Sequence, residues 1–210
     1  FLAKPVDDIG LMTRVRNLAR LKALNDEMRL RMSSGAEIGL VSGAKPDWSG
    51  AEAGARILLV EDQERAVQRV VAALSKMHTV DVEAGPQAAL VRLGDEAPYD
   101  LLIASLNLAG ADGLRLCSQV RTLERLRHLP IMVVTEPADE QRLLRALDMG
   151  VNDYLTRPID RHELLARVRT QIRRKRHSDY LRNSLSASLE LAVTDALTGL
   201  FNRRYLEKHA

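Results

Sequence analysis

Between residues 56 and 175, short apolar runs alternate with longer stretches in which apolar residues recur every three or four positions. The run Ile57–Val60 is apolar throughout, which is typical of a strand that is buried on both faces of a parallel sheet. The next stretch has apolar residues at helical spacing and predicts a helix with one apolar face. These apolar residues are Val67, Val70, Val71 and Leu74.

The alternation predicts an α/β fold. We expect strands at 57–60, 79–83, 101–104, 131–134 and 153–156, and helices at about 64–76, 86–94, 114–123, 138–149 and 160–193. Strands that alternate with helices form a parallel sheet covered on both faces, with right-handed crossovers. The working site of such a fold lies beyond the carboxyl ends of its strands.

Five polar residues follow or end the predicted strands. They are Glu61, Asp62, Ser105, Thr135 and Arg157. Because the carboxyl ends of parallel strands meet at one edge of a sheet, we expect two acids, two hydroxyls and a base on one rim. A solvated turn is the alternative interpretation of the acid pair alone.

These strand ends resemble those of the response-regulator receiver domain. The segments that carry the resemblance are ILLVED at 57–62, DLLIASLNLAGADG at 100–113, IMVVTE at 131–136 and DYLTRP at 153–158. The resemblance implies a flavodoxin-like sheet of strand order 2-1-3-4-5. It also implies that paired acids bind Mg²⁺, that an aspartate ending the third strand accepts phosphoryl from a histidine kinase, and that a threonine and a lysine contact the phosphoryl oxygens.

Two positions depart from that pattern, because Ser105 stands at the acceptor position and Arg157 at the lysine position. An un-ionised hydroxyl is a poor substitute for the carboxylate nucleophile, and its loss removes a hard oxygen ligand of the metal. We therefore expect a degenerate receiver over 56–175, with no metal bound. Our hypothesis is that the Arg157 guanidinium pairs with Glu61 or Asp62 and offsets their negative charge.

The first sixteen residues repeat the end of this module. Residues 1–16 and 154–169 share seven identities at an offset of 153: Leu2/Leu155, Pro5/Pro158, Asp7/Asp160, Leu11/Leu164, Arg14/Arg167, Val15/Val168 and Arg16/Arg169. Two helices that start alike, each with Pro and an Asp cap, are the plainer alternative. We interpret 1–32 as the last strand and helix of a first receiver, with Lys4 as its phosphate-contacting lysine; a surface lysine is the alternative for Lys4.

The segments that flank the complete module have linker and stalk character. Residues 33–55 are rich in Gly, Ser and Ala, which predicts a linker. Residues 176–194 predict a helical stalk that pairs with a second chain, because Leu181, Leu185, Leu189 and Ala192 recur at near-heptad spacing. For the basic run 173–177 we predict a solvated collar rather than a nucleic-acid site, since its charges circle the helix without aromatic neighbours.

The segment 195–210 opens with DALTGLFNRR, which resembles the opening of GGDEF-type diguanylate cyclase domains. The matching residues are Asp195, Leu197, Thr198, Gly199, Leu200, Asn202, Arg203 and Arg204. The order of segments resembles PleD-like response regulators, and both ends of the chain look cut. The resemblance implies that phosphorylation of the first receiver drives dimerisation, that the second is an adaptor, and that two cyclase domains use Mg²⁺ to condense two GTP into cyclic di-GMP. The catalytic residues of that domain are not in this chain, which we expect to be inactive alone.

The composition excludes several classes of protein. A 46% apolar chain can build a core, and the single Cys117 excludes a disulfide scaffold and fits a cytoplasmic protein. No apolar run approaches the roughly 18 residues of a membrane span, and the formal charge is only +3. We expect a homodimer of the parent protein, an upstream histidine kinase as partner, and no nucleic acid. A non-enzymatic receiver scaffold that acts by protein binding remains the alternative function.

Overall fold

The computed structural model describes residues 53–94 and 98–193, together with Val15 and Ala19; of the side chains, those of residues 185–193 are not described. The described residues belong to two compact units. One, which we call the sheet unit, reaches Arg176, and the other contains the residues from His177 onward. The predicted first-receiver tail with Lys4, nearly all of the linker, and the cyclase-like opening at 195–210 lie outside the described residues.

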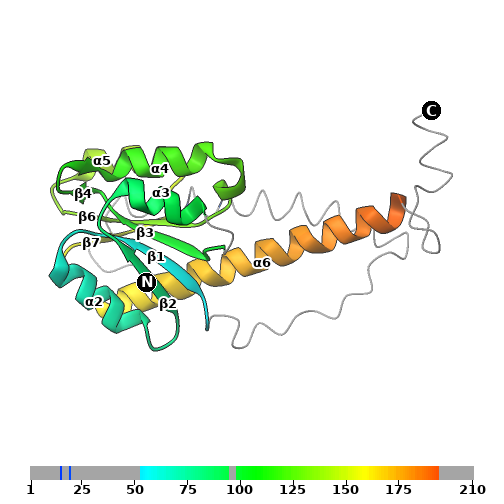
Figure 1. The fold of residues 1–210 in the computed structure, drawn as a ribbon, viewed down its shortest axis with the longest axis horizontal. Coiled ribbons are helices and arrows are strands. Elements are labelled where there is room, and N and C mark those ends of the chain that lie inside the picture. The colour runs from blue at the N-terminus through cyan, green and yellow to red at the C-terminus, as the bar shows by residue number, and fades with distance from the viewer. Residues whose placement is uncertain (1–14, 16–18, 20–52, 95–97, 194–210) are drawn as a thin grey trace. The chain divides into compact units, whose positions relative to one another are not determined.

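A five-stranded parallel sheet forms the centre of the sheet unit (Figure 1). Its strands are β1 (Arg56–Val60), β2 (Thr79–Glu83), β3 (Leu101–Ser105), β6 (Ile131–Thr135) and β7 (Asp153–Thr156). They lie in the order β2-β1-β3-β6-β7, and all neighbours are parallel. The predicted order 2-1-3-4-5 is therefore confirmed.

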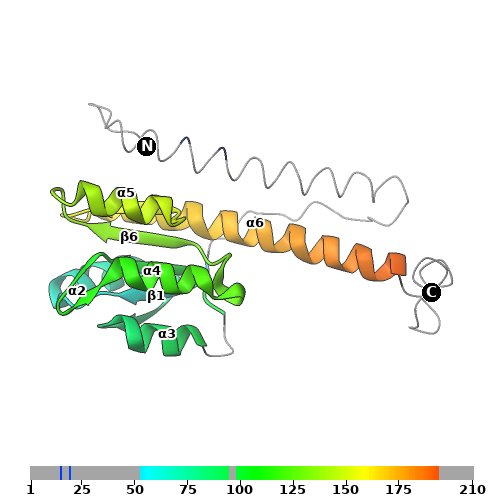
Figure 2. The ribbon, with the colours of Figure 1, turned by 90° about the horizontal axis from the view of Figure 1, so that it is seen from above.

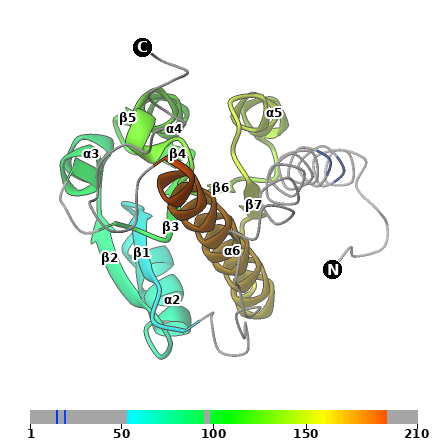
Figure 3. The same cartoon turned by 90° about the vertical axis from the view of Figure 1, so that its right-hand side faces the viewer.

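Five helices cover the two faces of this sheet. They are α2 (Glu64–Leu74), α3 (Pro86–Gly94), α4 (Gly113–Thr122), α5 (Glu140–Asp148) and α6 (Arg161–Val193). Figure 2 looks onto the face that carries α3, α4 and α5, and Figure 3 shows α2 and the first turns of α6 on the opposite face. The long last helix predicted from residue 160 to 193 is confirmed within one residue.

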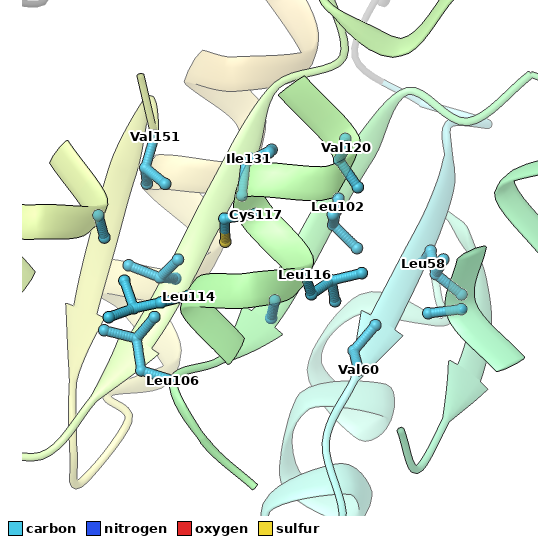
Figure 4. Close-up of a cluster of buried hydrophobic side chains, with 14 of the residues drawn as sticks. Leu58, Val60, Leu102, Leu106, Leu114, Leu116, Cys117, Val120, Ile131 and Val151 are labelled. Carbon is cyan, nitrogen blue, oxygen red and sulfur yellow. The ribbon is translucent and has the colours of Figure 1, made fainter. Parts of the chain in front are cut away.

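Alternate residues of the three central strands, β1, β3 and β6, pack into two separate cores. In β1, Leu58 and Val60 belong to the core under α3, α4 and α5, whereas Ile57 and Leu59 belong to the core under α2 and α6. Figure 4 shows the first core, in which Leu114, Leu116, Cys117 and Val120 of α4 lie over the sheet. Because side chains on both faces are buried, the positions 57–60, 101–104 and 131–134 of the central strands are all apolar, as the sequence pattern predicts.

The loop between β3 and α4 contains structure that the hydrophobic pattern does not predict. Residues Asn107–Leu108 (β4) and Ala111–Asp112 (β5) form a small antiparallel pair, and Gly110 between them has φ of +73°. Asp112, at the end of this pair, caps α4, since its carboxylate accepts a hydrogen bond from the Leu114 amide. After α4 comes a short 3₁₀ helix, η1 (Glu124–Leu126).

The prediction of a solvated basic collar at 173–177 is wrong for part of the run. Lys175 and Arg176 both form ion pairs with Asp100, and their side chains are only 16% and 27% exposed. Burial also lowers the pKa of Arg174. The reason is that these residues lie in the part of α6 that still packs in the sheet unit, near a carboxylate that precedes β3.

None of the described helices combines the length and the apolar composition that a bilayer crossing demands.

Gly113 has no room for a side chain. A Cβ atom there would lie 2.1 Å from the carbonyl oxygen of Ser105 and 2.8 Å from the Cα of Leu106. The start of α4 therefore packs directly on the backbone at the end of β3.

We predict that Gly113→Ala lowers the free energy of unfolding by about 1–3 kcal/mol, because α4 or the end of β3 must move. Gly85→Ala is the matched control, since its added Cβ meets no atom within 4 Å, and it should change stability by less than about 0.5 kcal/mol. Urea unfolding of the sheet unit, followed by circular dichroism, measures both. Equal effects of the two substitutions would refute the close approach.

Candidate functional site

The carboxyl ends of four strands bring the predicted site residues to one rim. Backbone hydrogen bonds extend the strand pairing past the strands, from the Glu61 amide to Glu83 (3.0 Å) and from the Arg157 amide to Thr135 (2.9 Å). Glu61, Ser105 and Thr135 are each at most 2% exposed. Four of the five predicted residues thus lie where β1, β3, β6 and β7 end.

Arg157 is the centre of the site. Its Nη2 forms an ion pair with Glu61 Oε2 and lies 3.3 Å from Ser105 Oγ, to which it donates. Its Nε lies 3.2 Å from Glu136 Oε1. The Arg157 side chain is 12% exposed and that of Glu61 1%, so this pair is shielded from solvent. Of the two acids that the sequence offered as partners, Arg157 pairs with Glu61.

The two adjacent acids have separate partners. The second oxygen of Glu61, Oε1, accepts a hydrogen bond from the Gln63 amide at 3.0 Å. The carboxylate of Asp62 instead accepts from the backbone amide of Ala109, in the loop after β3. Asp62 therefore ties this loop to the end of β1, and of the two adjacent acids only Glu61 contacts the guanidinium.

The two hydroxyls lie beside the pair with local backbone acceptors. Ser105 Oγ donates to the carbonyl of Asn107 at 3.3 Å, and Thr135 Oγ1 donates to the carbonyl of Glu136 at 3.4 Å. The Ser105 hydroxyl thus accepts from Arg157 and donates to Asn107. Thr135 shares the rim, and its hydroxyl bonds to the backbone beside it.

Arg142 of α5 is a site residue that sequence reasoning missed. It donates to Asn107 Oδ1 (2.7 Å), to the carbonyl of Leu106 (2.8 Å) and to Asp112 Oδ1 (2.6 Å). Asn107 also donates to Asp139, at the start of α5. These contacts hold the loop after β3 against α5. The spacing of apolar residues does not predict these contacts, because apolar residues do not recur at a regular interval in the loop that supplies the acceptors.

The residues present do not fit the Mg²⁺ that the receiver resemblance implies. A magnesium ion needs several hard oxygen ligands in near-octahedral geometry. Here one Glu61 oxygen holds a guanidinium and the other a backbone amide, while the carboxylate of Asp62 accepts from a loop amide. The third expected ligand is the hydroxyl of Ser105. Among the described residues, no group of three or more His, Cys, Asp or Glu side chains is placed to hold a metal.

We predict that Glu61→Gln destabilises the sheet unit by about 3 kcal/mol, because it leaves the Arg157 guanidinium buried without its closest counter-charge. Glu136→Gln removes the other carboxylate bound to the same arginine, and that carboxylate is 40% exposed. The control should therefore cost at most about 1 kcal/mol. Chemical denaturation at neutral pH compares the two, and an equal loss in both variants would contradict the account.

Comparisons with known proteins agree with the fold described above. The family model of the response regulator receiver domain matches residues 57–169. The response regulator PleD of Caulobacter vibrioides is 49% identical over 206 residues, which are 98% of this chain and 44% of PleD. The chain thus spans less than half the length of that curated relative.

Two solved structures show the same fold. A putative response regulator from Chloroflexus aurantiacus is 29% identical with a TM-score of 0.54, and the match covers 57% of this chain and 98% of that one. The signal receiver domain of an HD domain-containing protein from Pseudomonas fluorescens is 26% identical with a TM-score of 0.57, and the match covers 68% and 99%. With its parallel five-stranded sheet and its acid pair after β1, this chain belongs to the response regulator receiver domain family.

Proposed function

We propose that the sheet unit is an adaptor receiver, which keeps the receiver fold without accepting a phosphoryl group. The observation that carries this proposal is the buried ion pair between Arg157 and Glu61, next to a serine at the acceptor position. The positive charge opposite Glu61 comes from the protein itself, so this buried carboxylate has a counter-charge without an ion.

The chemistry of the rim supports this role. A serine hydroxyl is a weak phosphoryl acceptor unless a general base takes its proton, and the Ser105 hydroxyl donates instead to the backbone carbonyl of Asn107. Binding Mg²⁺ at Glu61 would first require displacing a guanidinium with 12% of its side chain exposed. The desolvated pair makes that exchange costly.

We further propose that the adaptor works within a diguanylate cyclase. The similarity to PleD over 98% of the chain and the cyclase-like opening at 195–204 support this proposal. In this scheme a histidine kinase phosphorylates an upstream receiver, to which Lys4 belongs, and the protein dimerises in the cytoplasm. Two cyclase domains held in one dimer have a raised effective concentration for each other and condense two GTP, with Mg²⁺, into cyclic di-GMP.

We predict that the wild-type sheet unit gives no saturable heat of Mg²⁺ binding at sub-millimolar concentration, with or without beryllofluoride. The double substitution Ser105→Asp with Arg157→Lys restores an acceptor carboxylate and a thinner basic side chain, and should give a measurable Mg²⁺ isotherm. Ser105→Asp alone is the control, since Arg157 still neutralises Glu61. Tight Mg²⁺ binding by the wild type would sink the adaptor assignment.

The experiment that tests the whole function uses the longer protein, with the upstream receiver and the downstream cyclase domain. Beryllofluoride should raise both the sedimentation-derived mass, from monomer to dimer, and the rate of cyclic di-GMP formation from GTP. Dimerisation without any cyclic di-GMP would instead indicate a scaffold that acts by protein binding. A protein that stays monomeric when activated would refute the dimerisation scheme.

A further inference from the structure

The carboxylate of Asp100 joins the segment that enters β1 to the last residues of the sheet unit. Asp100, immediately before β3, forms ion pairs with Lys175 Nζ (3.9 Å) and with Arg176 Nη2 (3.8 Å) near the end of the sheet unit. Its Oδ2 also accepts a hydrogen bond from the Arg56 amide at 2.9 Å, where β1 begins. We call Ala53, Arg56, Asp100, Lys175 and Arg176 the exit cluster.

Arg176 also bonds directly to the entering segment. Its Nη1 donates to the carbonyl of Ala53 at 3.0 Å, across 123 residues of sequence. The entering segment is held on its other side by the turn before β2, through the Gly54 amide to Met77 (2.7 Å) and the Thr79 amide to Ala55 (2.9 Å). Residues 53–55 are thus tied both to the edge of the sheet and to α6.

Helix α6 is held by shorter contacts in the turns before Lys175 and Arg176. There Asp153 forms an ion pair with Arg167 and accepts from Gln171 Nε2 at 3.1 Å, and the side chains of Arg167 and Asp153 are 11% and 16% exposed. The pairs at Asp100 are longer, at 3.9 and 3.8 Å, and ion pairs of that length are individually weak. The hydrogen bond from Arg176 to the Ala53 carbonyl is therefore the direct link between α6 and residues 53–55.

His78 interacts electrostatically with two members of the exit cluster, Arg176 and Asp100. Its Nδ1 is buried with no hydrogen-bond partner in the part of the chain that the structure describes. Burial first, and then the charge of Arg176, lowers the pKa of His78, while Asp100 acts in the opposite direction. The lowered pKa favours the neutral form of His78.

We propose that the exit cluster is a mechanical coupling that transmits a displacement of the entering segment 53–55 to α6 where the helix leaves the sheet unit. The signal then passes along the amino-terminal edge of the sheet and bypasses the closed rim at Arg157. The use of this coupling rests on the proposed adaptor function, whereas the coupling itself is a property of this chain. It gives a receiver without phosphoryl chemistry a route between the modules on either side.

Amide hydrogen exchange followed by NMR on the whole chain tests the coupling. Arg176→Gln substitutes a residue of α6, and it should speed exchange of the Gly54 and Thr79 amides about fivefold, since it removes the bond to Ala53 and one pair to Asp100. Asp100→Asn should speed exchange at the same amides and in α6 around residue 176. Asp148→Asn, the same change on an exposed residue at the end of α5, is the control and should leave these amides unchanged. Effects of Arg176→Gln confined to α6 would overturn the coupling.

A second measurement tests its use. In the longer protein, Asp100→Asn should reduce the beryllofluoride-dependent gain in cyclic di-GMP formation several-fold and leave the unstimulated rate unchanged. An unchanged gain, with coupling present by hydrogen exchange, would overturn the transmission role. A wild-type protein that forms no cyclic di-GMP would refute the proposed function instead, and the exchange result would stand without it.

Discussion

The ion pair between Arg157 and Glu61 is the interaction on which the character of this receiver depends. It joins residues 96 apart in sequence, from the ends of β1 and β7, and only 1% of the Glu61 side chain is exposed. A carboxylate that is so buried must be compensated, by a metal or by a protein cation. Here the chain supplies the cation, and the neighbouring side chains are arranged around it: Ser105 accepts from the guanidinium, and Glu136 binds its outer edge.

The parallel sheet explains how this pair is held at the rim. Both faces of the sheet pack into their own apolar cores, and the strands meet the rim with their backbone pairing intact. Gly113 lets α4 start against the backbone of Ser105, and Arg142 fastens the intervening loop to α5. The rim is therefore held by several contacts, and the longer ion pairs around Asp100 lie at the opposite edge of the sheet.

The hydrophobic pattern predicted the sheet well because each central strand is buried on both faces. The third strand was expected to end at Ala104 and ends at Ser105, and the helix expected at 138–149 spans Glu140–Asp148. The partner of Arg157 was predicted only as one of two acids, since the choice depends on the path of the loop that occupies Asp62. Arg142 and the docking of Lys175 and Arg176 were missed for a related reason. Their partners lie in loops, where position is set by tertiary packing rather than by periodicity.

The Arg157 guanidinium stands where other receivers of this family are expected to hold a cation. Paramagnetic broadening of the ¹⁵N-labelled chain by Mn²⁺ tests this, because it reports any metal near an amide. We expect the amides of Glu61, Asp62, Ser105 and Leu106 to keep their intensities at Mn²⁺ concentrations that broaden only exposed acidic sites. Selective loss of those four signals at low Mn²⁺ would contradict it.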